Sequence, residues 1–264
     1  MSKCLFCTNQ ADSLEHALPQ WLHRRVAPKT DGRFPVQVGR YVDGQGYLDQ
    51  RKHVSLRFEA RVVCVACNTG WMSKMESEVE RILRPLTDKL FPVLAHVHLE
   101  QLREHATILA RWLTKTALTT SYALPGKPHP PQSLMEDIAN GLSPRGIWMD
   151  VAKAKVSGLG AALTKTFPTI NGKKFVGVQT HNTGACFQFC IQVNQLLLRV
   201  GMTPGTEVGY IATNGLIPFR LFPDADTQVP EHFEFQDVQH FVHSIVLKTF
   251  AGCAGEVPTP PDLH

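Results

Sequence analysis

The chain has 264 residues, of which 43% are hydrophobic and 19% are charged, as is usual for a folded protein with room for a full core. No apolar run in the sequence approaches the roughly 20 residues that a membrane-spanning helix needs. The first residues also lack the apolar segment of a secretory signal. We therefore expect a cytoplasmic protein that makes no contact with a membrane.

The net charge of +4 is unevenly distributed along the chain. Residues 1–64 hold ten Lys/Arg against six Asp/Glu, so the whole positive excess lies in this stretch. A local basic excess suits a surface that binds the phosphate backbone of a nucleic acid. An ordinary solvated surface is the alternative. The candidate phosphate contacts are Arg24, Arg25, Arg40, Arg51, Lys52, Arg57 and Arg61.

Four of the seven cysteines form two C-x-x-C pairs, Cys4 with Cys7 and Cys64 with Cys67. Thiols stay reduced in the cytosol, so two such pairs predict a structural zinc site with four thiolate ligands. The 56 intervening residues exceed the usual spacing, which we attribute to an insertion between the two pairs. The other three cysteines show no such pairing, and Cys186 and Cys190 lie in an apolar run typical of a buried strand.

Hydrophobic periodicity predicts the elements of the N-terminal third. A short helix is expected at 19–26, and two strands with a turn at 43–46 between them are expected from Phe34 to about residue 63. A helical pattern begins after Cys67. Its apolar stripe comprises Trp71, Met72, Met75, Val79, Ile82 and Leu83, and Pro85 is expected to end or kink this helix.

The remaining two thirds divide into helical and strand-like stretches. Helices are predicted at about 86–95, 99–121, 133–140 and 236–250. Strands are predicted at 146–151, 174–179, 185–200, 208–211 and 216–222. These patterns predict an α+β fold in three parts, with a metal module at 1–85, a helical segment at 86–142 and a β-rich antiparallel C-terminal part at 143–264.

The motifs around the cysteines carry a resemblance to a known family. Cys4-x-x-Cys7, then Glu15-His16-x-x-Pro19, then Cys64-x-x-Cys67-Asn68 and a helix resemble an HNH endonuclease of the ββα-metal superfamily. The longer motifs, EHALPQWL at 15–22 and CNTGWMSKME at 67–76, are similar to those of HNH proteins from bacteria and phages. The resemblance covers about residues 4–80. It implies a ββα-metal module with an inserted β-hairpin.

The resemblance implies a role for three residues. Glu15 is expected to be a metal ligand, His16 the general base and Asn68 the second protein ligand of a catalytic Mg²⁺ or Mn²⁺ ion. The chain departs from the family at Glu59, which stands where the middle Asn is expected. Glu76 lies two helical turns after Asn68, so it is either a further ligand or brace or, as we favour, a solvated helix residue.

The residue types suit phosphodiester hydrolysis. A neutral His can take a proton from water near pH 7, and a hard divalent ion can neutralise charge on the leaving oxygen. Neighbouring residues of a regular strand point to opposite faces. For Glu15 and His16 to serve one site, a bend or bulge is therefore expected beside them.

These observations predict a metal-dependent HNH endonuclease, a hydrolase that acts on DNA, with RNA left open as a substrate. A phage or defence setting and a homodimer are also left open. The alternative is a non-catalytic zinc-ribbon module that binds nucleic acid or a protein partner. It needs the cysteines and the basic residues, but neither His16 nor Asn68. The C-terminal part is open to a role as a ligand sensor or oligomerisation domain.

Overall fold

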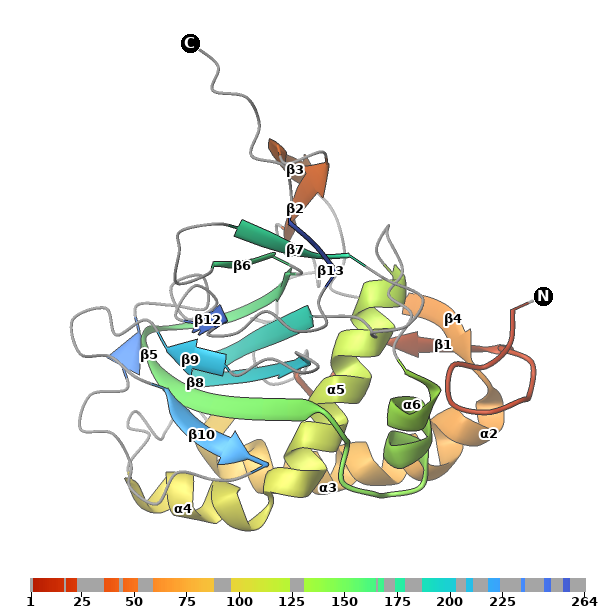
Figure 1. Ribbon diagram of the computed structural model, residues 1–264. Helices are drawn as coiled ribbons and strands as arrows, with labels where there is room; N and C mark the ends of the chain where they lie inside the picture. Colours follow the sequence, from red (N-terminus) through yellow and green to blue (C-terminus); the bar gives the residue numbers. More distant parts are fainter. Residues whose placement is uncertain are drawn as a thin grey trace.

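The computed structural model describes fifteen stretches of the chain (Figure 1). They are residues 2–16, 18–22, 36–42, 45–51, 59–87, 96–123, 131–164, 166–168, 174–178, 187–202, 208–210, 218–223, 234–235, 245–247 and 254–256. Several predicted features lie outside them. These are the second half of the helix at 19–26, the helix at 86–95 beyond residue 87, Cys186 and Cys253, and the candidate phosphate contacts Arg24, Arg25, Lys52 and Arg57.

Two strands and a helix form the N-terminal region. Strand β1 (Ser13–His16) pairs antiparallel with β4 (Glu59–Val63), and a helical stretch follows at once. This stretch comprises α2 (Val65–Cys67), a wider helical segment η1 (Asn68–Met72) and α3 (Ser73–Thr87). The backbone departs from helical geometry at Gly70, where φ is −90° and ψ is −110°. Residues at opposite ends of the predicted insertion are thus paired in one small sheet.

The inserted residues form a hairpin, but its second strand differs from the prediction. The strand expected after the turn at 43–46 is described only at residues 59–63, and there it pairs with β1 rather than with the first strand of the hairpin. Strand β2 (Val36–Val42) pairs antiparallel with β3 (Gln45–Arg51), and their register brings Val42 opposite Gln45. Arg40 and Arg51 belong to these two strands.

Segment η1 and helix α3 bury four of the six residues of the stripe predicted from the sequence, while Trp71 and Ile82 are half-buried. Met72, Met75, Val79 and Leu83 recur at the spacing of one helical face, and all four are buried. Trp71 packs edge-on against Phe6, with their ring centroids 5.2 Å apart. The helix continues two residues beyond Pro85. The missing N–H of this proline therefore falls in the last turn of the helix.

The helix predicted at 99–121 is in fact two helices. Helix α4 (His96–Glu104) and helix α5 (Ala106–Ala123) are separated by a turn at His105. No Gly or Pro marks this break, and the apolar pattern runs across it. Helix α6 (Gln132–Ala139) confirms the helix predicted at 133–140. Gly141, with φ of +79°, follows its last turn in the left-handed conformation typical of a helix end.

The largest sheet is built on two long strands. Strand β5 (Ile147–Thr164) pairs antiparallel with β8 (Phe187–Met202) along most of its length. Strand β10 (Phe219–Phe222) pairs antiparallel with β5 at residues 149–151, and β11 (Glu234–Phe235) pairs parallel with it at residues 153–154. Strand β5 extends well beyond the predicted residues 146–151. The residues beyond 151 are rich in Ala, Gly and Lys, and such a composition carries little strand signal.

Five short strands complete the described part of the C-terminal region. Strand β6 (Thr166–Pro168) and β13 (Ala254–Glu256) flank β7 (Lys174–Val178), while β9 (Val208–Tyr210) pairs with β12 (Ile245–Leu247). The helix predicted at 236–250 is wrong at residues 245–247, where hydrogen bonds to β9 hold the chain in a strand. Residues 236–244 lie outside the described residues.

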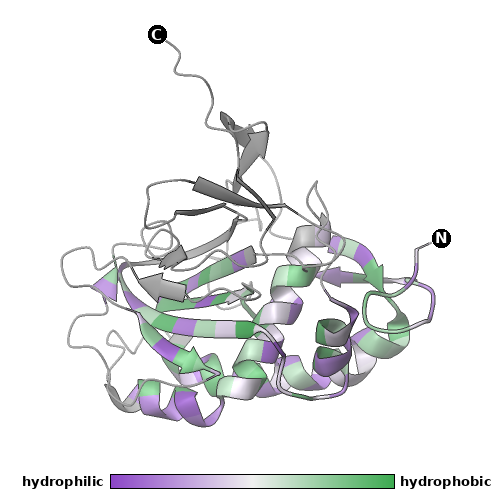
Figure 2. Ribbon diagram, in the orientation of Figure 1, coloured by the Kyte–Doolittle hydropathy of each residue, from purple (hydrophilic) through white to green (hydrophobic). Residues whose placement is uncertain are grey.

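One hydrophobic core joins the three predicted segments. Helix α5 packs against α3 and β4 on the N-terminal side and against β5, β8 and β10 on the other (Figure 1). Its residues Leu109, Trp112 and Leu113 are fully buried. In Figure 2, green apolar segments lie on α5 and on the strands of the large sheet. The predicted α+β class with mainly antiparallel sheets is confirmed. Within the described residues, no helix is long and apolar enough to cross a membrane.

Candidate metal centre and adjoining polar network

The two C-x-x-C pairs meet at one point. The four Sγ atoms of Cys4, Cys7, Cys64 and Cys67 all lie within 4.8 Å of one another. The Cys7 Sγ is 3.6 Å from the Cys64 Sγ and 3.7 Å from the Cys67 Sγ. A tetrahedral zinc with Zn–S bonds of about 2.3 Å places its sulfur ligands about 3.8 Å apart. The spacing of these thiols therefore fits a zinc-sized ion.

Backbone contacts hold the two cysteine turns together. The Cys4 N–H donates to the Asn9 carbonyl at 2.8 Å, and the Leu5 N–H donates to the Val62 carbonyl at 2.8 Å. The first turn is thereby attached to strand β4. At the second turn, the Cys67 N–H faces the Cys64 Sγ at 3.4 Å. Burial raises the pKa of the Cys64 thiol, but this N–H and the neighbouring thiols outweigh burial and lower that pKa to about 7.

Strand β1 has an irregular register just before Glu15. Ser13 pairs with Val63 and Glu15 pairs with Ala60, so two steps along β1 face three steps along β4. The irregularity predicted beside Glu15 and His16 is therefore confirmed. Glu15 is buried, whereas His16 is half-buried. The two side chains consequently have different partners.

His16 lies beside a carboxylate on the neighbouring strand. It is the cross-strand partner of Glu59, and its Nε2 atom is 3.1 Å from Oε1 of that residue. The side-chain amide of Gln20 lies 3.3 Å from the same nitrogen. An ionised carboxylate only accepts hydrogen bonds, so pairing with an ionised Glu59 places the proton on Nε2 and leaves the Nδ1 lone pair as the basic site. In this tautomer Nε2 has no lone pair for the NH₂ group of Gln20.

Asn68 reaches back to strand β1 from the start of η1. Its Nδ2 group donates to Ser13 Oγ at 2.8 Å and to the Leu14 carbonyl at 3.2 Å. Both amide protons are thus used on β1, and the side-chain oxygen is the atom left for a metal or a substrate. Asn68 therefore braces the irregular strand that carries Glu15 and His16.

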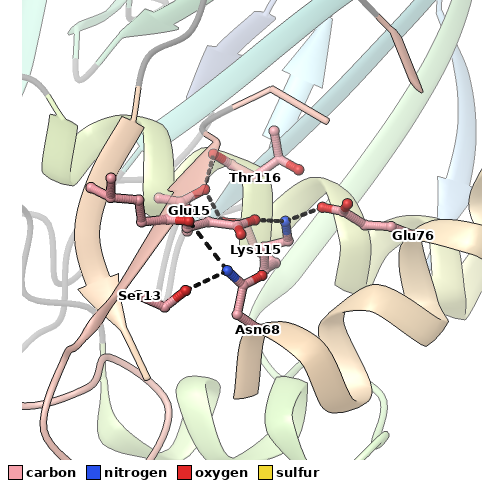
Figure 3. A network of polar contacts seen from close by, with 8 residues as sticks. Ser13, Glu15, Asn68, Glu76, Lys115 and Thr116 are labelled. Atoms are coloured by element: carbon pink, nitrogen blue, oxygen red, sulfur yellow. Dashed lines mark hydrogen bonds and ion pairs between the residues drawn. The ribbon is translucent and has the colours of Figure 1, made fainter. Parts of the chain in front are cut away.

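Glu15 is paired with a buried lysine. Its Oε1 atom is 2.6 Å from Lys115 Nζ, and Glu76 Oε1 lies 2.5 Å from the same nitrogen. Figure 3 shows the two carboxylates approaching Lys115 from opposite sides. Lys115 comes from α5, Glu15 from β1 and Glu76 from α3, so this triad ties three elements together. Glu76 is a brace for Lys115 rather than a freely solvated helix residue.

The triad contains more negative than positive charge. Burial raises the pKa of Glu15, the Glu76 carboxylate adds to the rise, and Lys115 opposes it. Burial alone would lower the pKa of Lys115, but the carboxylates of Glu76 and Glu15 outweigh it and the pKa is raised. The lysine side chain has no exposed surface, yet it is held as an ammonium ion.

Lys115 is the residue that the sequence analysis missed. Between residues 108 and 118 its helix holds seven apolar residues and two charged ones, Arg111 and Lys115, a composition that indicates burial of much of the helix. A lysine in such a helix is a candidate for burial, and a buried lysine needs carboxylate partners. This signal was available in the sequence, although the identity of the partners was not.

Of the candidate phosphate contacts, Arg61 has a described side chain. It is exposed on β4, between the half-buried Val62 and the buried Ala60. The roles of the seven basic residues remain predictions.

Comparisons with known proteins found no matching family model, no similar curated protein and no similar solved structure.

Proposed function

We propose that the protein is an HNH-type endonuclease, a hydrolase of phosphodiester bonds in DNA, with a structural zinc ion on its four cysteines. The observation that carries the proposal is the half-buried His16 beside Glu59. This pair sits on a two-stranded sheet that continues directly into the cysteine-held helix. The resemblance in the sequence supplies the reaction class, and the local geometry supports His16 as the general base.

The chemistry of this pair follows from its hydrogen bond. Glu59 holds the Nε2–H group, so Nδ1 can accept a proton from an attacking water molecule. The carboxylate then stabilises the imidazolium that forms, as an orienting acid does in other histidine-based hydrolases. In this proposal Glu59 replaces the family's middle Asn and orients the base. Strand pairing places it directly opposite His16.

The divalent ion that the resemblance implies would neutralise charge at the scissile phosphate. The oxygen of Asn68 suits such an ion. Oε1 of Glu15, however, is already bound by the Lys115 ammonium, and a second cation there would meet its charge. The residues as they stand do not fit an ion shared by Glu15 and Asn68, so no step is assigned to it. A metal-ligand role for Glu15 stays a prediction.

A nicking assay on supercoiled plasmid tests the proposal. With Mg²⁺ or Mn²⁺ present, we expect the wild-type protein to nick DNA and His16→Ala to lose about 100-fold or more in rate, as is typical for a general base. Glu59→Gln keeps the shape and loses the charge, so it should fall between the two. Zinc content and thermal unfolding of each variant serve as controls for folding. Full activity of His16→Ala would contradict the proposal.

The second candidate function is a non-catalytic zinc module that binds nucleic acid or a protein. The Glu15–Lys115 ion pair favours it, because this pair gives Glu15 a structural role without any reaction. Under this function the wild-type protein would bind nucleic acid without cutting it. Substitution of a cysteine would then abolish binding, and His16→Ala would leave it unchanged.

A further inference from the structure

The Glu15–Lys115–Glu76 triad has the form of two carboxylates bridged by a cation. The cation is the Lys115 ammonium, which lies 2.6 Å from one carboxylate oxygen and 2.5 Å from the other. A Ca²⁺ ion would bind such oxygens at about 2.3–2.6 Å, and Mg²⁺ at about 2.0–2.1 Å. The ammonium nitrogen is thus placed where a divalent ion shared by the two carboxylates would be.

The position of the ammonium is determined by three separate elements. Strand β1, helix α3 and helix α5 each supply one member, and helix α5 is fixed by the core on both of its sides. The lysine side chain is fully buried, and Glu15 is nearly so. Without a cation between them, two carboxylates would face each other in a site largely removed from water, which is strongly unfavourable.

We propose that Lys115 is a built-in replacement for a divalent metal ion. Its ammonium closes the Glu15–Glu76 carboxylate pair to Mg²⁺ and Mn²⁺ in the native protein. Removal of the side chain converts the pair into a divalent-ion site. A tethered cation does not lose translational freedom when it occupies the site, so it has an advantage over an ion in solution. The inference concerns the metal requirement of the region, and it holds whether or not the protein cuts DNA.

Two substitutions of Lys115 separate the effect of the charge from that of the space. Lys115→Ala removes the ammonium and leaves room for a hydrated ion. Lys115→Met also removes the charge but fills most of the same volume with an apolar chain. Both variants lose the ion pairs equally, so a difference between them in metal binding reports on the vacated cation position.

The experiment is a titration of zinc-loaded protein with MnCl₂, followed by calorimetry and by the melting temperature. We expect Lys115→Ala to bind one additional Mn²⁺ and its melting temperature to rise with the Mn²⁺ concentration. Wild type and Lys115→Met should lack this additional ion and the stabilisation that it gives. Adding Glu76→Gln or Glu15→Gln to Lys115→Ala should weaken Mn²⁺ binding by about tenfold or more, because each removes a charged ligand.

If Lys115→Ala does not fold without added metal, the inference can still be tested. Refolding is then repeated with and without Mn²⁺, and recovery that depends on Mn²⁺ supports the inference. A variant that neither binds Mn²⁺ nor is rescued by it overturns the inference. Mn²⁺ binding by the wild-type protein that is lost in Glu15→Gln also overturns it. None of these measurements uses cleavage, so their outcome is independent of the nuclease proposal.

Discussion

Two buried ionic networks stabilise the two sides of the molecule, and they have opposite charge balances. Beside the cysteine cluster, one lysine serves two carboxylates, Glu15 and Glu76. In the large sheet, one carboxylate serves two arginines, because Asp150 binds the fully buried Arg199 and also Arg220.

The two networks differ in how they can respond to a change in charge. The guanidinium of Arg199 donates to Asp150 Oδ2 through two nitrogens, at 3.0 Å and 2.7 Å, and it also lies over the Trp148 ring. Such a planar group stays charged at all accessible pH values and fixes direction as well as charge. A carboxyl of the first network can instead relieve a charge imbalance by taking up a proton. The sheet network is therefore rigidly structural, and the lysine network is adjustable.

The largest effect is expected from removal of the zinc that we propose on the four cysteines. Chelation should release the first turn from β4 and expose amides of β1, β4 and α2, because metal binding and folding are coupled in small zinc modules. Strands β5 and β8 should stay protected, since apolar contacts hold them. Hydrogen exchange with and without a chelator measures this directly, and added zinc should restore protection. Equal loss of amide protection in both regions would show that the zinc site and the large sheet do not unfold separately.

The next largest effect is expected from Asp150→Asn. The substitution leaves Arg199 charged and buried without its carboxylate, which typically costs about 3–5 kcal/mol of folding free energy. Because arginine does not titrate, the loss should be the same from neutral to mildly acid pH. Urea unfolding of the variant and of wild type at several pH values measures the size of the loss and its independence of pH. The double variant Asp150→Asn/Arg199→Met is the matched control, and it should recover part of the loss.

A smaller and pH-dependent effect is expected from Lys115→Met at neutral pH. Glu15 then lacks its cation, and its pKa, which burial already raises, should rise further. A carboxyl with a raised pKa in the folded state destabilises that state when ionised. Stability relative to wild type should therefore recover as the pH falls from neutral toward the ordinary value of 4.5.

Urea unfolding at several pH values checks this sign. The matched control is Lys115→Met/Glu15→Gln, in which no buried carboxyl is left at position 15 and the recovery should be largely absent. A loss in Lys115→Met that is constant between neutral and mildly acid pH would contradict the adjustable character of the lysine network.

Local patterns determined much of this structure. The two C-x-x-C pairs predicted four convergent thiols, and the apolar stripe of α3 predicted its buried face, because ligand spacing and helical period are local properties. The helix at 133–140 and the strands along β7 and β8 were predictable for the same reason. The break at His105 and the length of β5 were not, because packing and strand pairing decide them without a strong local signal.

The contacts of the candidate site depended on the tertiary structure. Glu15, His16, Asn68 and Glu59 could all be named from their motifs. That Glu59 faces His16, however, follows from a strand register set across the 42 residues that separate β1 and β4. That Glu15 binds a lysine 100 positions away follows from the packing of α5 against both regions. Motif residues can be recognised locally in the sequence. The charged groups that decide what they can bind belong to distant segments, which only the packing of the core brings beside them.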